Sequence, residues 1–291
     1  MTNRESFPSL SIVGVCGSIG SGKSFACSLL TSKLNDLGLA SSEQTLSTSE
    51  IPVIAAHHID TDSLAHGVYE PGSKAITEIG EEFGQHVIAD GTVDRKALGA
   101  IAFGDKSKMA VSTVINIFQT GGSRFDSCCT LASNFMHYAI IFQKLERIVW
   151  PHVKDLLLQR IKGIEESTKG EVNNGRSHTV VIVEAAVLLD ANWDDNDLFD
   201  AIWVVRASSD TSCERLVQNR GMKKEEALNR LQAQLDRRGI GNWKEELESG
   251  AVTAVIENEG SAAAELWNKV KQCLVDPKCW KDDRCPPELG I

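Results

Sequence analysis

The chain lacks several features that mark common classes of protein. Its eight cysteines include no C-x-x-C pair, its first eleven residues hold no basic segment followed by an apolar stretch, and there is no internal repeat. The most apolar long run, residues 180–189, is interrupted by Glu184 and is too short to span a bilayer. These absences argue against a disulfide framework, a zinc site, a signal peptide and a membrane-spanning segment. We therefore expect a cytoplasmic protein with scattered reduced thiols.

A basic surface is missing as well. The chain has 30 Lys and Arg against 40 Asp and Glu, which gives a formal net charge of −10. Broad binding of nucleic acid or of anionic membranes needs a basic surface, so we expect neither as a partner and no stable membrane insertion. The hydrophobic content of 42% and the charged content of 24% are ordinary for a globular enzyme. An acidic protein of this kind can still bind phosphates through a local cluster of Arg, Lys and backbone N–H groups.

Short apolar runs alternate with helical patterns along the chain. The runs predict buried strands at residues 11–15, 52–59, 180–183, 201–205 and 252–256. A helical pattern at residues 23–37 follows the first run, whereas the Ser/Thr-rich residues 40–49 indicate a surface loop. The alternation predicts an α/β fold, a parallel sheet with helices on both faces.

One glycine-rich motif stands out. The residues Gly17-Ser-Ile-Gly-Ser-Gly22-Lys23-Ser24 match G-x-x-x-x-G-K-[ST] in full, between a predicted strand and a predicted helix. The alternative is a chance glycine turn that opens a helix, and the complete match in this setting disfavours it. The motif predicts ATP binding by Gly17, Ser18, Ile19, Gly20, Ser21, Gly22, Lys23 and Ser24.

The chemistry of such a loop is specific. Its glycines let backbone N–H groups curl around an anion, and the helix N-terminus adds a partial positive charge. Lys23 would reach the β- and γ-phosphates, and the Ser24 hydroxyl would ligate Mg²⁺. ATP and Mg²⁺ are therefore the expected cofactors. A phosphate loop alone does not distinguish kinases from switches, motors or passive nucleotide binders.

Two carboxylates, Asp60 and Asp62, follow the second predicted strand. Ligands of open α/β sheets bind beyond the carboxyl ends of the strands, so we expect both residues near the γ-phosphate of ATP. A carboxylate there can orient or deprotonate an attacking hydroxyl, or hold Mg²⁺ through water. The alternative is that either residue only caps the following helix. We favour a functional role for Asp62 and leave Asp60 open.

Arginines gather in the later helical patterns. Arg215 and Arg220 lie on the predicted helix 210–220, and Arg230, Arg237 and Arg238 follow it. Arginine neutralises the charge of a transferring phosphoryl group with planar, bidentate geometry. Charge runs on helices are usually solvated faces with pairs at i,i+4. We favour this second interpretation for Arg230, and the pattern leaves Arg215 and Arg220 open.

Further motifs follow one another along the chain. They are His58-Ile-Asp60-Thr-Asp62-Ser-Leu-Ala-His66, Tyr69-Glu-Pro71-Gly72, Ile88-Ala-Asp-Gly91-Thr-Val-Asp-Arg95, Ala102-Phe103-Gly104, Trp150-Pro151, Glu184-Ala-Ala-Val-Leu-Leu189 and Glu214-Arg215-Leu216. With the phosphate loop, this order of motifs resembles the dephospho-coenzyme A kinase family, and especially the kinase domain of animal bifunctional coenzyme A synthase. The resemblance extends over about residues 12–274, and its several unrelated motifs are far more specific than the phosphate loop.

The resemblance implies that ATP phosphorylates the ribose 3′-hydroxyl of dephospho-coenzyme A, the final step of coenzyme A synthesis. Asp62 matches the proposed general base of the family, Arg215 and Arg220 match lid arginines that contact phosphate, and Arg95 matches a basic position in the substrate subdomain. The residues expected to act in catalysis are Asp62, Lys23, Arg215 and Arg220. The residues expected to bind the substrate are Asp60, Asp62, His66 and Arg95. Two alternatives stay open, another small-molecule P-loop kinase and a nucleotide-binding protein without turnover.

On this basis we expect one P-loop kinase domain. Its core would comprise residues 10–60 and 178–275, with a coenzyme A-binding subdomain at 61–177, a lid at 218–248 and a loosely held tail at 276–291. The chain departs from the family at residues 41–50, which lengthen a short connection, and at residues 235–250, which match poorly.

The main departure is residues 111–143, for which the family has no counterpart. The segment has no clear amphipathic period and interrupts what should be a continuous helix, so we expect it to pack poorly. It is either a lineage-specific surface loop or a translated intron. The second hypothesis rests on its ends, because Val111-Ser112 can be encoded as the splice donor GTA-AGT and Phe142-Gln143 as the acceptor TTY-CAG.

Overall fold

The computed structural model describes residues 10–43, 53–94, 96–98, 101, 132–169, 177–260, 262–282 and 284–286. The chain divides into two compact units. The first comprises Met1–Asp60 and Arg160–Ile291, and the second comprises Thr61–Gln159. The first unit is therefore discontinuous in sequence, and its second segment begins inside a helix.

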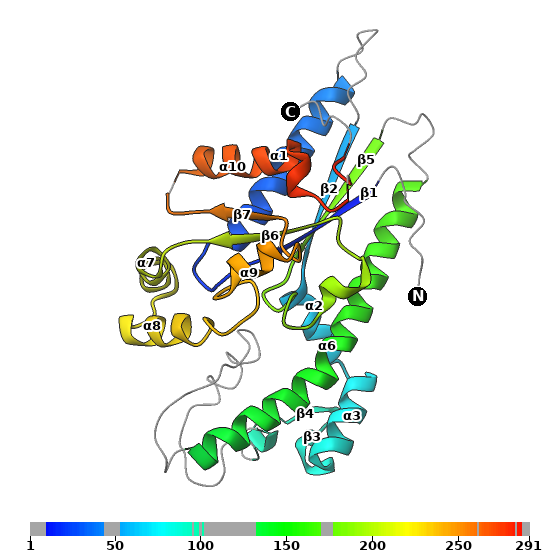
Figure 1. Cartoon of the computed structure of the whole chain (residues 1–291). Coiled ribbons are helices and arrows are strands. Elements are labelled where there is room, and N and C mark those ends of the chain that lie inside the picture. Colours follow the sequence, from blue (N-terminus) through cyan, green and yellow to red (C-terminus); the bar gives the residue numbers. More distant parts are fainter. Residues whose placement is uncertain are drawn as a thin grey trace. The chain divides into compact units, whose positions relative to one another are not determined.

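The first unit is built on a five-stranded sheet in the order β2-β5-β1-β6-β7, in which every pair of neighbours is parallel (Figure 1). The strands are β1 (Leu10–Cys16), β2 (Val53–Asp60), β5 (Ser177–Glu184), β6 (Ala201–Arg206) and β7 (Ala254–Glu257). All seven residues of β1 are buried, as expected for the central strand of a parallel sheet covered on both faces. The predicted α/β fold is confirmed.

Helices α1 (Lys23–Glu43) and α10 (Ala263–Val275) cover one face of this sheet. Leu30 and Leu34 of α1 join Leu266 and Val270 of α10 in one apolar cluster with the strands. The connection after β5 covers the other face, and its Leu188 approaches Gly14 so closely that a Cβ there would collide with it. Helix α1 continues to residue 43, so the predicted surface loop 40–49 is wrong at its first four residues.

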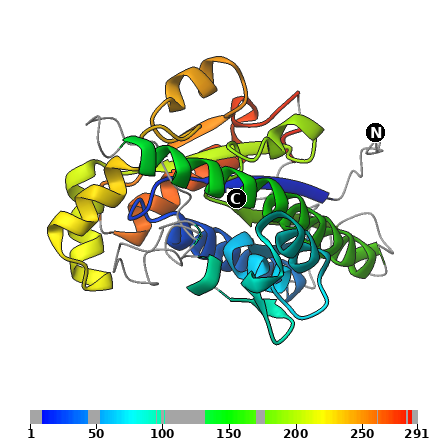
Figure 2. The same ribbon diagram turned by 90° about the horizontal axis from the view of Figure 1, so that it is seen from below.

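Helices α7 (Ser209–Arg220) and α8 (Lys224–Gln232) lie side by side at one edge of the first unit (Figures 1 and 2). The side chain of Ser208 caps α7 by accepting a hydrogen bond from the N–H of Thr211, and Gly221 ends the helix in the left-handed conformation with φ 64°. Helix α9 (Trp243–Glu248) follows. The predicted lid, residues 218–248, therefore contains α8, α9 and the end of α7.

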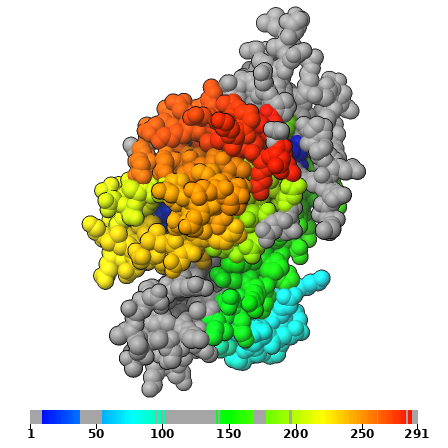
Figure 3. Space-filling view, viewed as in Figure 1, coloured from blue at the N-terminus to red at the C-terminus, as the bar shows by residue number. Residues whose placement is uncertain are grey.

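The C-terminal segment after α10 is packed on the first unit. After the short 3₁₀ helix η3 (Pro277–Cys279), Trp280 is only 5% exposed and lies edge-to-face against Trp203 at 5.8 Å between ring centroids. The indole N–H of Trp280 donates to the carbonyl of Cys273 at 3.1 Å. In the space-filling view, the red residues of this end lie against the orange residues of the same unit (Figure 3). The prediction of a loose tail is thus wrong for residues 276–282 and 284–286.

The second unit contains α2 (Thr61–Val68), α3 (Lys74–Phe83) and a small hairpin of β3 (Ile88–Ala89) and β4 (Thr92–Val93), preceded by the 3₁₀ helix η1 (Gln85–Val87). The chain turns after residue 89, where Asp90 and Gly91 take φ values of 52° and 73°. Positive φ at both central residues is what a two-residue hairpin turn requires.

Helix α6 (Ala132–Lys169) extends from the second unit into the first. His152 and Lys144 bind it to α3 through Glu78 and Glu82, at 3.1 and 2.5 Å. The helix includes the last part of the predicted insertion, and Ile141 in that part is 5% exposed. The expectation that residues 111–143 interrupt the helix is therefore wrong for residues 132–143, and the expectation of poor packing is wrong for Ile141. Residues 111–131 lie outside the described part of the chain.

Within the described residues, no helix combines the length and the apolar character needed to cross a membrane.

Candidate nucleotide site

The phosphate loop lies at the carboxyl end of β1, the central strand, and leads directly into α1. Its turn needs glycine for two physical reasons. Gly17 and Gly22 have φ values of 152° and 86°, and a Cβ at Gly17 would collide with the carbonyl of Val205. At Gly22 it would collide with the side-chain amide of Asn258. The loop therefore runs against the ends of the neighbouring strands with no room for side chains at these positions.

Side chains from distant segments hold the carbonyl groups of the loop. The amide of Asn258 donates to the carbonyl of Ser21 at 2.8 Å, and Nη1 of Arg215 donates to the same carbonyl at 3.2 Å. Nη2 of Arg215 donates to the carbonyl of Gly260 at 2.8 Å. Within the loop, the N–H of Ser21 donates to the carbonyl of Ser18 at 3.3 Å. Arg215 therefore ties the loop to the segment that follows β7.

The loop is also joined to the predicted lid region. The N–H of Ile19 donates to Oε1 of Gln234 at 2.7 Å. The Ile19 side chain packs in a small apolar cluster with Leu216 of α7 and with Ala227 and Leu231 of α8. A movement of α8 would therefore change the packing around Ile19 in the phosphate loop.

Glu184, the last residue of β5, is the centre of the site. Its Oε1 accepts hydrogen bonds from Nζ of Lys23 at 2.9 Å and from the hydroxyl of Ser24 at 2.6 Å. Its Oε2 lies 3.1 Å from Nε2 of His58. Burial alone would raise the pKa of Glu184, but the hydrogen bond of His58, the charge of Lys23 and the hydrogen bond of Ser24 outweigh it and lower the pKa to about 2. Glu184 is therefore a carboxylate at neutral pH.

Glu184 begins one of the sequence motifs, but the motif alone does not predict a role for it in the site. A signal was present, because this carboxylate stands alone inside the most apolar run of the chain. Its meaning depends on strand register, since β2 and β5 pair so that Asp60 lies opposite Glu184 at the carboxyl end of the sheet. Of the predicted site residues, the structure brings Asp60, Lys23, Ser24 and Arg215 to this end of the first unit.

The remaining predicted site residues are distributed over both units. Asp62 is exposed in the first turn of α2, in the second unit, and Nδ1 of His66 lies 3.0 Å from the backbone carbonyl of Asp62. Arg220 is the exposed last residue of α7. Arg95 lies outside the described residues. Arg230 pairs with Glu226 at i,i+4 with an N–O distance of 2.7 Å, which agrees with the solvated-face interpretation.

Two arginines of the poorly matched segment 235–250 form a second charged cluster. Arg237 pairs with Asp190 at 3.2 Å, and Arg238 pairs with Asp194 at 3.1 Å and with Glu246 at 2.9 Å. These bonds connect the segment that follows β5 to α9. Because each guanidinium group already pairs with an acidic side chain, we interpret this cluster as a structural anchor.

The cysteines near the site are poor nucleophiles. Burial raises the pKa of Cys16 to about 12, and burial together with the negative charge of Glu184 raises the pKa of Cys27. Cys16, Cys27, Cys213, Cys273, Cys279 and Cys285 are free thiols, as expected for these six.

A phosphate loop at the end of a central parallel strand, with a lysine, a hydroxyl and a carboxylate converging at the start of the following helix, defines a P-loop NTPase-type protein. Comparison with known proteins narrows this class. The family model of dephospho-CoA kinase matches residues 36–118 and 130–263. The break in this match, residues 119–129, falls inside the predicted insertion.

Individual relatives agree with the family model. A dephospho-CoA kinase of Thermobifida fusca is 27% identical over 272 residues, which cover 90% of this chain and 97% of that protein. Those of Shouchella clausii and Geobacter sulfurreducens are 27% and 28% identical over 224 and 239 residues, covering 77% and 80% of this chain and 81% and 94% of theirs. A crystal structure from Thermus thermophilus shares the fold with a TM-score of 0.50 and 22% identity, over 91% of this chain and 97% of its own.

The chain belongs to the dephospho-CoA kinase family. The predicted family and the predicted activity, phosphorylation of dephospho-coenzyme A by ATP, are confirmed. The closer resemblance to the animal bifunctional coenzyme A synthase stays a prediction.

Proposed function

We propose that this chain transfers the γ-phosphoryl group of ATP to the ribose 3′-hydroxyl of dephospho-coenzyme A with the residues around Glu184. The 3′-oxygen forms a bond to the γ-phosphorus while the bond between that phosphorus and the β,γ-bridging oxygen breaks, so the products are coenzyme A and ADP. The observation that supports this most strongly is the convergence of Lys23, Ser24 and Glu184 at the phosphate loop. Catalysis of this kind depends on positioning and on charge stabilisation.

The donor set at the loop fits Mg²⁺. The Ser24 hydroxyl and Oε1 of Glu184 lie 2.6 Å apart, and Asp60 ends the neighbouring strand opposite Glu184. These are the hard oxygen ligands that Mg²⁺ prefers, with water completing its shell. When bound, Mg²⁺ would neutralise charge on the β- and γ-phosphates. Ser24 and Glu184 are the residues that would hold the ion.

Lys23 would change partners when ATP binds. Its ammonium group is paired with Glu184 at 2.9 Å. The β- and γ-phosphates carry more charge than one carboxylate, so Lys23 would turn to them and leave Glu184 to the metal. The remaining residues of Gly17–Ser24 would hold the phosphates with backbone N–H groups at the start of α1.

The proposal also includes the roles predicted for the residues that would act on the acceptor substrate. Asp62 would accept the proton of the 3′-hydroxyl, and Arg215 and Arg220 would balance the charge that develops on the transferred group. Asp60, His66 and Arg95 would bind the substrate. Arg215 has the geometry for its role because its guanidinium group already lies against the carbonyls of the loop.

The test is ADP release by the purified protein with dephospho-coenzyme A, adenosine, AMP, shikimate and pantothenate as acceptors. We expect dephospho-coenzyme A to be strongly preferred. Equal or better turnover of adenosine or AMP would replace the proposal with another small-molecule kinase. ATP binding without turnover of any acceptor would replace it with a nucleotide-binding protein.

A further inference from the structure

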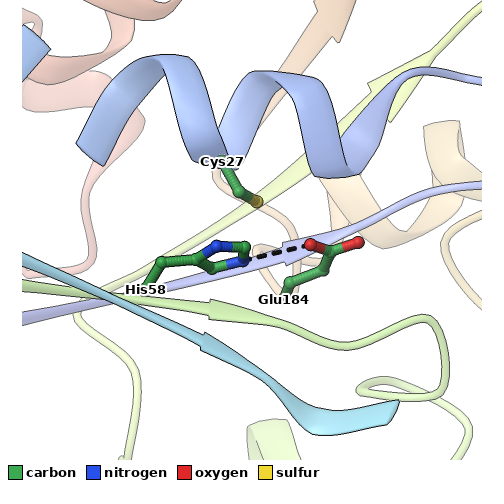
Figure 4. A group of neighbouring side chains, drawn as sticks. All are labelled: Cys27, His58 and Glu184. Carbon is green, nitrogen blue, oxygen red and sulfur yellow. Dashed lines mark hydrogen bonds and ion pairs between the residues drawn. The ribbon is translucent and has the colours of Figure 1, made fainter. Parts of the chain in front are cut away.

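Three metal-ligating side chains from three separate elements meet beside the phosphate loop. Cys27 lies on α1, His58 on β2 and Glu184 at the end of β5. The Cys27 sulfur, an imidazole nitrogen of His58 and a carboxylate oxygen of Glu184 all lie within 4.8 Å of one another. Figure 4 shows the three side chains pointing toward a common centre, with the hydrogen bond between His58 and Glu184 drawn.

This donor set differs from the one that suits Mg²⁺. Magnesium takes oxygen ligands, whereas thiolate, imidazole and carboxylate together are typical ligands of Zn²⁺ and related divalent transition ions. Tetrahedral zinc with such ligands keeps its donor atoms about 3.5 Å apart, so small side-chain rotations suffice to close the present arrangement. Three protein ligands leave the fourth position to water.

We propose that Cys27, His58 and Glu184 form a site for a divalent transition ion of the zinc class, and that occupation of this site inhibits the kinase. The bond that forms joins the metal to the sulfur of Cys27, and the thiol proton leaves to solvent. No oxidant or reductant takes part.

Burial sets how a metal reaches the site. Cys27 is 1% exposed and Glu184 is also buried, whereas the His58 side chain is 23% exposed. The ion therefore enters past His58. Burial, first, and the charge of Glu184 raise the pKa of the Cys27 thiol. A dication reverses this electrostatic balance because a coordinating thiol is deprotonated outright.

Inhibition follows because the carboxylate of Glu184 would be shared between the transition ion and Mg²⁺. Lys23 and Ser24 both bond to Oε1 of Glu184, and the proposed role of Glu184 is to hold Mg²⁺. A transition ion on Glu184 competes for the group that orders the phosphate loop. The metal site itself does not depend on the proposed function, whereas the inhibition does.

The binding test uses Co²⁺ as a spectroscopic probe and reduced, metal-free protein. A cobalt–thiolate bond gives a charge-transfer absorption in the near ultraviolet, and we expect this band with one Co²⁺ bound in the presence of Cys27. Cys27→Ser should lose the band, whereas Cys279→Ser, which removes another thiol of the same unit, should keep it. A band that persists in Cys27→Ser would overturn the metal site, as would its loss in Cys279→Ser alone.

Affinity provides a second measurement. Competition against a chromophoric chelator should show that Cys27→Ser and His58→Asn each weaken Zn²⁺ binding by about tenfold or more. Circular dichroism melts would show whether each variant is folded, and Cys27→Ala is the second choice if serine is not tolerated in this buried position. Folded variants with wild-type Zn²⁺ affinity would overturn the site.

Measurements of turnover test the proposed inhibition separately from metal binding. With ATP, Mg²⁺ and dephospho-coenzyme A, added Zn²⁺ should slow the wild type reversibly, and a chelator should restore the rate. Cys27→Ser should need about tenfold more Zn²⁺ for the same fractional inhibition, each protein being compared with its own zinc-free rate. Equal sensitivity of the two proteins would overturn the inhibition. If no turnover is found with any acceptor, the proposed function fails, and the cobalt band still decides the metal site.

Discussion

The hydroxyl of Ser24 donates a hydrogen bond of 2.6 Å to Oε1 of Glu184, a residue 160 positions further along the chain. The same oxygen accepts from Lys23 at 2.9 Å. One buried carboxylate at the end of β5 thus connects the first turn of α1 to the sheet. Glu184 therefore holds two residues at the end of the phosphate loop, Lys23 and Ser24, through one oxygen atom.

Glu184→Gln should change how stability depends on pH. The pKa of Glu184 is lowered from 4.5 to about 2 in the folded chain. A lowered carboxyl pKa contributes stability above the unfolded value and loses it as pH falls through the folded value. Between pH 7 and pH 3 the wild type should therefore lose about 2 kcal/mol more unfolding free energy than Glu184→Gln.

Urea unfolding at the two pH values measures this difference. Glu81→Gln, which changes an exposed carboxyl of α3, serves as the control and should follow the wild type. Equal pH dependence of the wild type and Glu184→Gln would mean that Glu184 gains no net stabilisation from Lys23, Ser24 and His58.

Lys23→Ala should abolish most turnover while the fold persists. The change removes the charge assigned to the β- and γ-phosphates and leaves Glu184 without its ammonium partner. We expect kcat/KM for ATP to fall by about two to three orders of magnitude. Steady-state kinetics would show this, with Lys33→Ala on an exposed position of α1 as the control. A loss of less than a few fold would exclude Lys23 from phosphate binding.

Much of the first unit could be predicted from the sequence because its signals are local. The complete phosphate-loop motif and the short apolar runs specify strands, a turn and a following helix without information from distant residues. The role of Glu184 was not predictable in the same way. It depends on the parallel register that sets Asp60 opposite Glu184 and brings Lys23 within reach.

The features of the fold that were not predicted from the sequence have similar causes. The helical start of α6 at residue 132 lacks a clear period, so its helical conformation could not be inferred from pattern. The tail was expected to be loose because its sequence has no period, but Trp280 fits against Trp203 of a distant strand. The approach of Cys27 to His58 was equally hidden, since the two residues are brought together by the packing of α1 on the sheet. Tertiary contacts decided each of these features.

Arg215→Lys should impair turnover although it preserves charge. Lysine cannot bond at once to the carbonyls of Ser21 and Gly260, as the two terminal nitrogens of Arg215 do. We expect kcat/KM to fall by about tenfold or more. This loss would exceed what a surface ion pair can contribute, which is only about 0–1 kcal/mol. Arg230→Lys is the control, since the pair that Arg230 forms with Glu226 at i,i+4 lies within α8. Near-normal kinetics of Arg215→Lys would mean that Arg215 has no role in turnover beyond its contacts with the loop carbonyls.

Trp280→Ala should destabilise the first unit. The side chain is 5% exposed, packs edge-to-face on Trp203 and donates to the carbonyl of Cys273. Truncation of a buried tryptophan costs about 3–5 kcal/mol because it removes apolar contacts and leaves a cavity. Chemical unfolding would measure the loss, with Lys278→Ala on an exposed position of η3 as the control. Unchanged stability of Trp280→Ala would mean that the tail detaches in solution.

Asp62→Asn separates the two interpretations of Asp62. Asparagine has nearly the same shape but cannot accept the proton of the 3′-hydroxyl, so the general-base role requires kcat to fall by about 10²–10⁴-fold with little change in ATP affinity. A role confined to the first turn of α2 requires the opposite pattern, a lower melting temperature with near-normal turnover. Asp210→Asn is a matched control because Asp210 is an exposed carboxylate in the first turn of α7, and its variant should show only the helix effect. Kinetics measured beside thermal melts of both variants distinguish these outcomes. If Asp62→Asn behaves like Asp210→Asn, the base must be another residue, and Asp60 at the end of β2, opposite Glu184, becomes the carboxylate to test next.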